Sequence, residues 1–142
     1  MNLELIEQVA DRLDLAASRL IRENRRRDKG SDLSAARLGA LSAVAASGPL
    51  SLAKLAAAQQ VRAPTMSRIV EGLVRDGLVL REVDASDRRG IRIRVTEKGA
   101  ALLCEGRKLR ARALADRMKR LGESEQRALA RGVELLERLT RN

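Results

Sequence analysis

The sequence of 142 residues contains no phenylalanine, tyrosine, tryptophan or histidine, and its only cysteine is Cys104. Without histidine, a Ser-His-Asp triad, a Cys-His pair and a histidine-ligated metal are all excluded. A single cysteine cannot close an intrachain disulfide or form a thiolate cluster, which is typical of a reducing compartment. We therefore expect a protein that is not an enzyme and that holds no metal or other cofactor.

Long apolar runs are also missing. No run approaches the roughly 20 residues that a membrane-spanning helix needs. The N-terminal stretch MNLELIEQVADRLD carries acids early and lacks the basic flank and apolar centre of a signal peptide. We expect a cytoplasmic protein without a membrane partner, and its length suits one domain or a small core with dimerising arms.

What the sequence has in excess is positive charge. It contains 29 lysines and arginines against 19 acids, a formal net charge of +10. Such a charge attracts polyanions from a distance, and guanidinium groups suit phosphates and guanine edges. An arginine-rich genome would give the same total, so the clustering of the arginines has to decide between the two interpretations.

Apolar spacing predicts four helices in the first half of the chain. Residues 3–21 repeat apolar positions every three or four residues, which indicates a long amphipathic helix that ends at the charged segment 22–32. Ser34 and Ser51 are suited to cap the next two helices. Pro64 suits the first position of a fourth helix.

The period then changes from helical to alternating. Gly77 is expected to end the fourth helix, and residues 78–83 and 91–95 read as two strands joined by the polar connector DASDRRG. Thr96 is expected to cap a long helix and Ser124 a last one. The predicted fold is mainly α (α+β), a winged helix-turn-helix core with a two-stranded wing and with N- and C-terminal dimerisation helices.

The helix-turn-helix pattern points to DNA. Its second helix has the length to lie in a major groove about 12 Å wide. We expect its buried stripe to be Ile69, Val70, Leu73 and Val74. The candidates for major-groove contacts stand in or near its first turn: Pro64, Thr65, Ser67 and Arg68.

The hairpin carries the second candidate contact. Arg88 and Arg89 stand at its tip, which is slim enough for a narrow, electronegative minor groove. Asp84 and Asp87 would pair with a nearby guanidinium and orient the loop. An ordinary solvated turn is the alternative interpretation. Three further arginines are candidate phosphate contacts: Arg62, Arg92 and Arg94.

Two stretches, APTMSRIVEGLVRDGLVLR and DASDRRGIRIRVTEKG, together resemble the multiple antibiotic resistance regulator (MarR) family. That family shows Leu-x-x-x-Gly-Leu-Val-x-Arg, then Asp-x-Arg, then Thr-x-x-Gly. Here the pattern falls on Leu73, Gly77, Leu78, Val79, Arg81, Asp87, Arg89, Thr96 and Gly99. The resemblance implies a homodimeric winged helix-turn-helix transcription regulator, usually a repressor, that binds a palindromic operator in double-stranded DNA.

The resemblance also assigns roles. It implies that Arg89 is the minor-groove arginine and that Asp87 orders the loop beside it. One departure from the pattern is that Arg62 and Ala63 stand where many relatives have a serine, so the usual capping hydroxyl is missing. Relatives often bind small phenolic or lipophilic ligands in a cleft between the DNA-binding part and the dimer helices, so a small lipophilic or anionic effector is expected here. Such a cleft would be aliphatic here, with Arg19 or Arg37 as candidates for an acidic group.

A dimer is expected from the residues alone as well. The apolar stripes of the terminal helices are too long for a small winged core to cover. A two-fold dimer would bury them and set two recognition helices roughly 34–36 Å apart, whereas the alternative folds both helices back on their own core. We expect an N-terminal dimerisation helix in 1–30, a DNA-binding domain in 31–100 and C-terminal dimerisation helices in 101–142.

Some features leave alternatives open. The arginine run 25–27 either contacts phosphates or solvates a loop. Cys104 is either a redox sensor or a small buried hydrophobe, and the second is favoured. Besides a sequence-specific regulator, the sequence allows a non-specific architectural DNA-binding protein or a winged-helix protein-interaction module.

Overall fold

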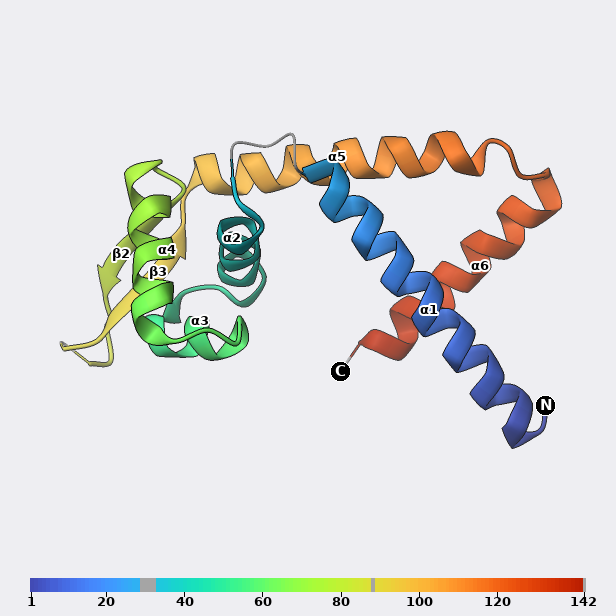
Figure 1. The fold of residues 1–142 in the computed structure, drawn as a ribbon, viewed down its shortest axis with the longest axis horizontal. Coiled ribbons are helices and arrows are strands. Elements are labelled where there is room, and N and C mark those ends of the chain that lie inside the picture. Colours follow the sequence, from blue (N-terminus) through green and yellow to red (C-terminus); the bar gives the residue numbers. More distant parts are fainter. Residues whose placement is uncertain (29–32, 88, 142) are drawn as a thin grey trace. The chain divides into compact units, whose positions relative to one another are not determined.

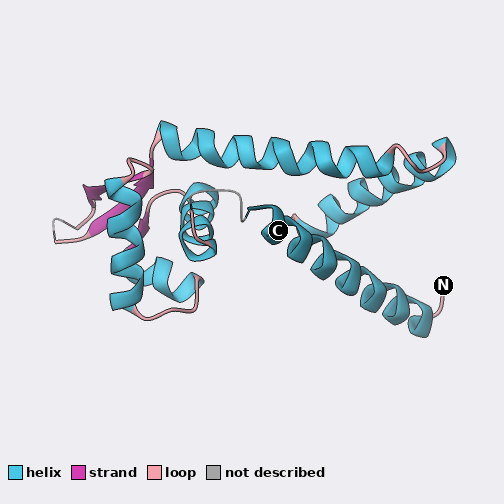
Figure 2. Cartoon of the chain, turned by 45° about the horizontal axis from the view of Figure 1, so that its top comes forward, coloured by secondary structure: helices cyan, strands magenta, loops and turns pink. Residues whose placement is uncertain are grey.

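The computed structural model describes residues 1–28, 33–87 and 89–141. These residues form six helices and one small sheet (Figures 1 and 2). In chain order the elements are α1 (Leu3–Asp28), α2 (Ala35–Ser47), β1 (Leu50–Ser51), α3 (Leu52–Ala58), α4 (Ala63–Arg75), β2 (Val79–Val83), β3 (Ile91–Val95), α5 (Glu97–Met118) and α6 (Glu123–Thr140).

The chain divides into two compact units within α5. The first comprises Met1–Gly106 and the second Arg107–Asn142. The first unit holds the helix-turn-helix (α3 and α4), the sheet and the beginning of α5. We call residues 33–103 the winged lobe, because the hydrophobic core and the residues packed against it all lie in this range.

The core of the winged lobe is aliphatic. Helices α2, α3 and α4 pack against one another and against the strands of the sheet. No polar side chain is buried among the described residues. The buried apolar residues are Leu33, Ala40, Leu41, Val44, Leu55, Ala56, Met66, Val70, Leu73, Leu78, Val79 and Ile93.

The sheet has three antiparallel strands in the order β1-β3-β2. The wing pairs Val79 with Val95 and Val83 with Ile91, and β1 adds Leu50 opposite Ile93. The two wing strands were predicted, but the sequence pattern did not predict β1. A strand of two residues is too short to show a period of two.

The ends of the core helices confirm the expected caps. The Ser34 hydroxyl accepts a hydrogen bond from the Arg37 N–H at 3.3 Å, and the Ser51 hydroxyl accepts one from the Lys54 N–H at 3.2 Å. Gly77 has φ +71°, the left-handed conformation that favours glycine. The Gly99 N–H donates to Thr96 Oγ1 at 3.1 Å, so Thr96 caps α5.

Three predicted boundaries differ from the structure. Helix α1 continues to Asp28, beyond the expected end before residue 22, because arginine is a good helix former and basic side chains suit a helix C-terminus. Helix α4 begins at Ala63, one residue before Pro64. Helix α6 is capped at Gly122 rather than Ser124, and the Glu125 carboxylate accepts the Gly122 N–H at 2.8 Å.

The buried face of α4 also differs from the prediction. Ile69 is half-buried and Val74 is 38% exposed, whereas Met66 is fully buried. The unbranched thioether of Met66 fills the space between α4 and the core. The inward stripe is therefore Met66, Val70 and Leu73, which is the i, i+4, i+7 spacing of one helix face.

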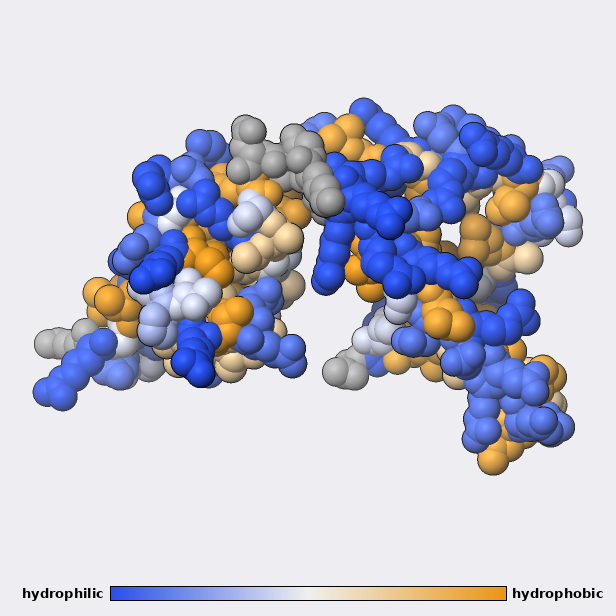
Figure 3. Space-filling view, in the orientation of Figure 1, coloured by the Kyte–Doolittle hydropathy of each residue, from blue (hydrophilic) through white to orange (hydrophobic). Residues whose placement is uncertain are grey.

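The terminal helices bury none of their described residues. In α1, Leu3, Leu5, Ile6, Val9, Leu13, Leu15, Leu20 and Ile21 are each at least 40% exposed. In α6, Leu129, Val133, Leu135, Leu136 and Leu139 are exposed. Figure 3 shows such hydrophobic surface at the N-terminal end of α1. Among the described residues, no helix is long and apolar enough to cross a membrane.

Candidate nucleic-acid interface

The first turn of α4 presents polar residues to solvent. Arg62 takes the N-cap position without a side-chain hydrogen bond to the helix, which matches the missing hydroxyl of the sequence. Pro64, Thr65 and Arg68 are exposed and Ser67 is half-buried. The first N–H groups of a helix have no intrahelical partner and favour anions, so this turn is suited to contact a phosphate backbone and base edges.

The same outer face extends further along α4 than the sequence analysis proposed. Glu71 and Arg75 are both exposed. They follow Arg68 by three and seven residues, so they lie on its side of the helix. The i+3 and i+7 spacing from Arg68 indicates both positions in the sequence, although they lie beyond the first turn.

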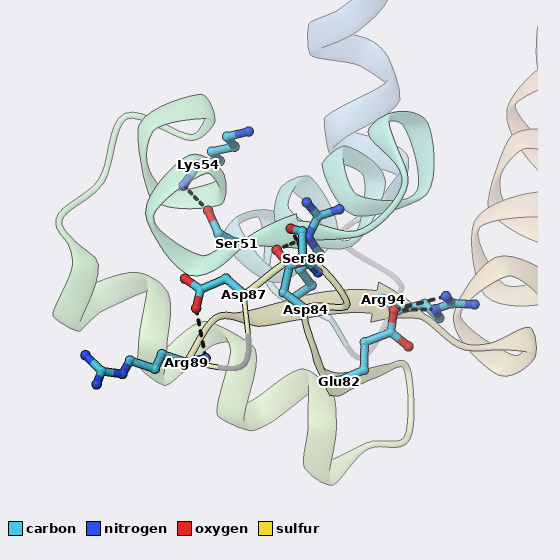
Figure 4. Close-up of polar contacts among 9 residues, drawn as sticks. Ser51, Lys54, Glu82, Asp84, Ser86, Asp87, Arg89 and Arg94 are labelled. Carbon is cyan, nitrogen blue, oxygen red and sulfur yellow. Dashed lines mark hydrogen bonds and ion pairs between the residues drawn. The ribbon is translucent and has the colours of Figure 1, made fainter.

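The wing tip is a turn held by its own aspartates (Figure 4). The Asp84 N–H donates to the Gly90 carbonyl at 2.8 Å, and the Gly90 N–H donates to the Asp87 carbonyl at 2.9 Å. The Asp84 carboxylate accepts the Ser86 N–H and hydroxyl at 2.9 and 2.8 Å and the Arg92 Nε at 2.8 Å. The turn is thus bridged by hydrogen bonds of Asp84 and Asp87, the two residues for which the sequence analysis proposed an orienting role.

Asp84 and Asp87 act through different partners. Asp84 pairs with the Arg92 guanidinium as expected. Asp87 accepts the backbone N–H of Arg89 at 3.0 Å, which is the partner shown for it among the described residues. Figure 4 shows the Arg89 side chain pointing away from the turn, which leaves its charge presented to solvent. Arg88 lies outside the described residues.

The hydrogen bonds of Asp84 set its protonation. The N–H and hydroxyl of Ser86 and the guanidinium of Arg92 lower the pKa of this carboxyl from 3.8 to about 2. Each of these donors stabilises the charged form. Asp84 therefore stays anionic at any physiological pH.

The strand arginines are paired with carboxylates. Arg92 bonds Asp84, and the Arg94 guanidinium lies 3.0 Å from the Glu82 carboxylate. Both remain partly exposed, with 43% and 54% of their side-chain surface accessible. A phosphate would have to displace these carboxylates from Arg92 and Arg94. Arg62 is exposed and has no ion pair with a described residue, so a phosphate contact there requires no such exchange.

The two groups of candidates come together at one edge of the winged lobe. Helix α4 and strand β2 run in opposite directions along the lobe, and in Figure 1 the N-terminal end of α4 and the tip of the wing lie toward the same edge. The N-terminal turn of α4 and the tip of the wing thus lie toward one edge of the lobe. A helix and a loop in this arrangement match the docking of a winged helix-turn-helix on DNA.

The structure also describes Arg37 and Cys104, which the sequence analysis considered for effector binding and for redox sensing. Arg37, one of the two candidates for an acidic effector group, is paired with Asp76 at 3.1 Å, so an effector would have to displace this carboxylate. Cys104 is half-buried in α5. Among the described residues, no group of three or more acidic or cysteine side chains is arranged to hold a metal ion.

The sequence profile of the MarR family matches residues 31–90. An HTH-type transcriptional regulator of Mycobacterium tuberculosis is 34% identical over 129 residues, which are 91% of this chain and 90% of that protein. The chain belongs to the MarR family. Its members are transcription regulators with a helix-turn-helix, and this MarR protein is accordingly a DNA-binding regulator and not an enzyme.

Solved structures show the same fold. A transcriptional regulator of Thermotoga maritima superposes with a TM-score of 0.83 at 20% identity, covering 94% of each chain. A mutant of Staphylococcus aureus MepR bound to an oligodeoxyribonucleotide superposes with a TM-score of 0.68 at 21% identity, covering 93% of this chain and 98% of that one. The winged fold predicted for this MarR protein is confirmed, with the third strand as an addition.

Proposed function

We propose that this MarR protein is a repressor that binds a palindromic operator in double-stranded DNA as a homodimer. The observation that carries the proposal is the shared edge formed by the exposed first turn of α4 and the ordered wing tip. The net charge of +10 supports the choice of a polyanion as partner.

Base recognition is assigned to α4. Thr65, Ser67 and Arg68 would face the major groove, with Pro64 at the helix start beside them. Hydroxyls bond several base edges and an arginine reads guanine through O6 and N7. Arg62 would contact a phosphate, as would Arg92 and Arg94 after exchanging their carboxylate partners.

The wing is assigned to the minor groove. Arg89 is exposed, and its backbone is fixed by Asp87 while its side chain points outward. Ordering the backbone before binding reduces the entropy lost when the arginine enters a narrow groove. Arg88 is proposed as its neighbour in this contact on sequence grounds alone.

The homodimer is supported by the uncovered apolar residues of α1 and α6. Isolated exposed leucines are ordinary, but stripes along two long helices are not. A second copy of the chain would cover the stripes and set two recognition helices for the two halves of a palindrome.

We infer the mode of regulation from membership of the MarR family. Release from the operator by a small lipophilic or anionic effector is the expected mode. Aromatic stacking cannot contribute, because the sequence has no aromatic residue. We place the protein in the cytoplasm, since its DNA target lies there.

The test is a binding titration at fixed salt with labelled DNA from upstream of the gene. A scrambled duplex of equal composition and an excess of unrelated DNA serve as competitors. Binding that survives the competitor supports a specific regulator, because specific and non-specific affinities differ typically by about 10³–10⁷. Equal loss to every competitor would instead indicate an architectural protein, and no binding at low salt a protein-interaction module.

A further inference from the structure

Helix α4 contains a glycine, Gly72, at a position where a side chain would not fit. Gly72 is buried, and a glycine inside a helix lowers helix stability relative to alanine. A Cβ at this position would overlap the guanidinium of Arg37, which comes from α2. The missing side chain of Gly72 therefore lets the Arg37 guanidinium lie directly against the backbone of α4.

The same guanidinium reaches the C-terminal end of α4. Arg37 Nη1 lies 3.1 Å from Asp76 Oδ2, and the two side chains are 27% and 42% exposed. Gly72 and Asp76 are four residues apart, so they lie on one face of the helix. Arg37 thus contacts α4 at two successive turns with one planar group.

Helix α5 holds the same end of α4 through other atoms. Lys98 Nζ donates to the Asp76 carbonyl at 2.9 Å, and Thr96 Oγ1 donates to the Gly77 carbonyl at 2.6 Å. A Cβ on Gly99 would overlap the Leu78 carbonyl, so α5 also needs a glycine for its close approach. The recognition helix is therefore fixed at its C-terminal end from two sides, whereas its N-terminal end carries no side-chain cap.

We propose that Arg37, Gly72 and Asp76 are positioning residues that set the orientation of α4 for reading bases; we call them the α4 clamp. This inference rests on the proposed function. Base contacts require atoms to be held within about 0.5 Å and 10–20° of the productive geometry. Phosphate contacts by flexible arginines tolerate a tilt better, so loss of the clamp lowers specific binding more than non-specific binding.

Asp76→Asn separates positioning from a direct phosphate contact by the sign of its effect. The substitution removes one negative charge, so the net charge rises by one, and it takes away the anionic partner of Arg37. If Arg37 served mainly to contact phosphate, the variant would bind all DNA more tightly. The clamp predicts instead that affinity for the operator falls by about tenfold, while affinity for scrambled DNA does not fall.

Gly72→Ala tests the same role without changing the charge. Alanine favours the helix more than glycine, but its methyl group displaces the guanidinium. The clamp predicts a lower ratio of specific to non-specific affinity in a protein that is still folded. Asp116→Asn is the matched control, because it removes an exposed carboxylate paired with Lys119 in the second unit and should leave the ratio unchanged.

The experiment titrates the wild type and the three variants with operator and scrambled duplexes, after thermal unfolding has shown which variants are folded at the assay temperature. A lower ratio for Asp76→Asn and Gly72→Ala supports the clamp. An unchanged or higher ratio in either folded variant overturns it, and if one variant is unfolded the other decides. A wild type that does not distinguish the two duplexes contradicts the proposed function itself.

Discussion

The winged lobe and the terminal helices differ in how many of their apolar side chains are buried. The lobe buries twelve hydrophobic residues. Helices α1 and α6 bury none, although both carry leucine and valine along their lengths. The lobe therefore contains its own core, whereas neither α1 nor α6 contributes a buried residue to one. The lobe is the part that reads DNA in our account, and the terminal helices are the part that needs a second copy.

The largest expected effect comes from the core of the lobe. Leu41 is fully buried, so Leu41→Ala should lower the free energy of unfolding by about 2–5 kcal/mol through lost burial and the cavity left behind. Thermal unfolding followed by helical circular dichroism measures the change. Leu80→Ala is the control in the same lobe, because Leu80 is 40% exposed, and an equal effect of both changes would contradict the assignment of the core.

The next effect concerns the terminal helices. Val133→Glu places a charge on the apolar stripe of α6 and should shift the protein from two chains toward one at micromolar concentration. Light scattering with refractive-index detection measures the mass, because the chain lacks aromatic absorbance. Arg131→Glu introduces the same carboxylate on the polar face and should leave the mass unchanged. A wild type with the mass of one chain would contradict the proposed dimer.

Two helix ends within the lobe allow a smaller comparison. At the end of α4, the N–H of Gly77 donates to the Val74 carbonyl and the N–H of Leu78 to the Leu73 carbonyl. The end of α3 has the same pattern: the N–H of Gln60 donates to the Ala57 carbonyl and the N–H of Val61 to the Ala56 carbonyl. Gly77 has φ +71° and Gln60 has φ +54°, so both occupy the left-handed position of this motif.

Gln60→Gly should therefore stabilise the fold by about 1 kcal/mol, since only the side chain opposes this backbone conformation. Gly77→Ala should destabilise it by a similar amount. Thermal unfolding of the two variants beside the wild type measures both. A destabilising Gln60→Gly would show that the Gln60 side chain contributes more than its backbone strain removes.

The smallest effect is local and depends on pH. Because the pKa of Asp84 is lowered from 3.8 to about 2 in the fold, its hydrogen bonds stabilise the wing fully above about pH 4. This contribution is lost as pH falls toward 2. Carboxyl NMR should show a titration midpoint near 2 for Asp84, and the Ser86 amide resonance should move with it. A midpoint near 3.8 would mean that the turn is not held by Asp84 in solution.

Sequence patterns predicted the winged lobe well because its signals are local. Ser34, Ser51 and Thr96 cap helices and Gly77 ends one, and each of these roles depends on neighbouring residues. The clamp could not be predicted, because Arg37 and Asp76 are 39 residues apart in sequence. Met66 and β1 were missed for related reasons, since tertiary packing rather than periodicity determines both.

The candidate site was predicted unevenly. The wing aspartates were named from turn chemistry, and the structure shows hydrogen bonds for both. The pairing of Asp84 with a guanidinium was expected, but the ion pair of Arg94 with Glu82 was not, because sequence gives the strand alternation but not the register of β2 and β3 that brings these two side chains together. The apolar stripes of α1 and α6 can be read from the sequence, but the proposed contacts with a second chain cannot, because they join residues that are not neighbours in sequence.

The most direct test of the account is the affinity of Arg89→Ala and Arg68→Ala for operator DNA, measured at one salt concentration against the wild type. We predict that Arg89→Ala weakens binding by about 1–3 kcal/mol. We predict that Arg68→Ala weakens it and also relaxes the preference for one base. Wild-type affinity in Arg89→Ala would contradict the assignment of the wing, and unchanged base preference in Arg68→Ala would contradict the assignment of α4.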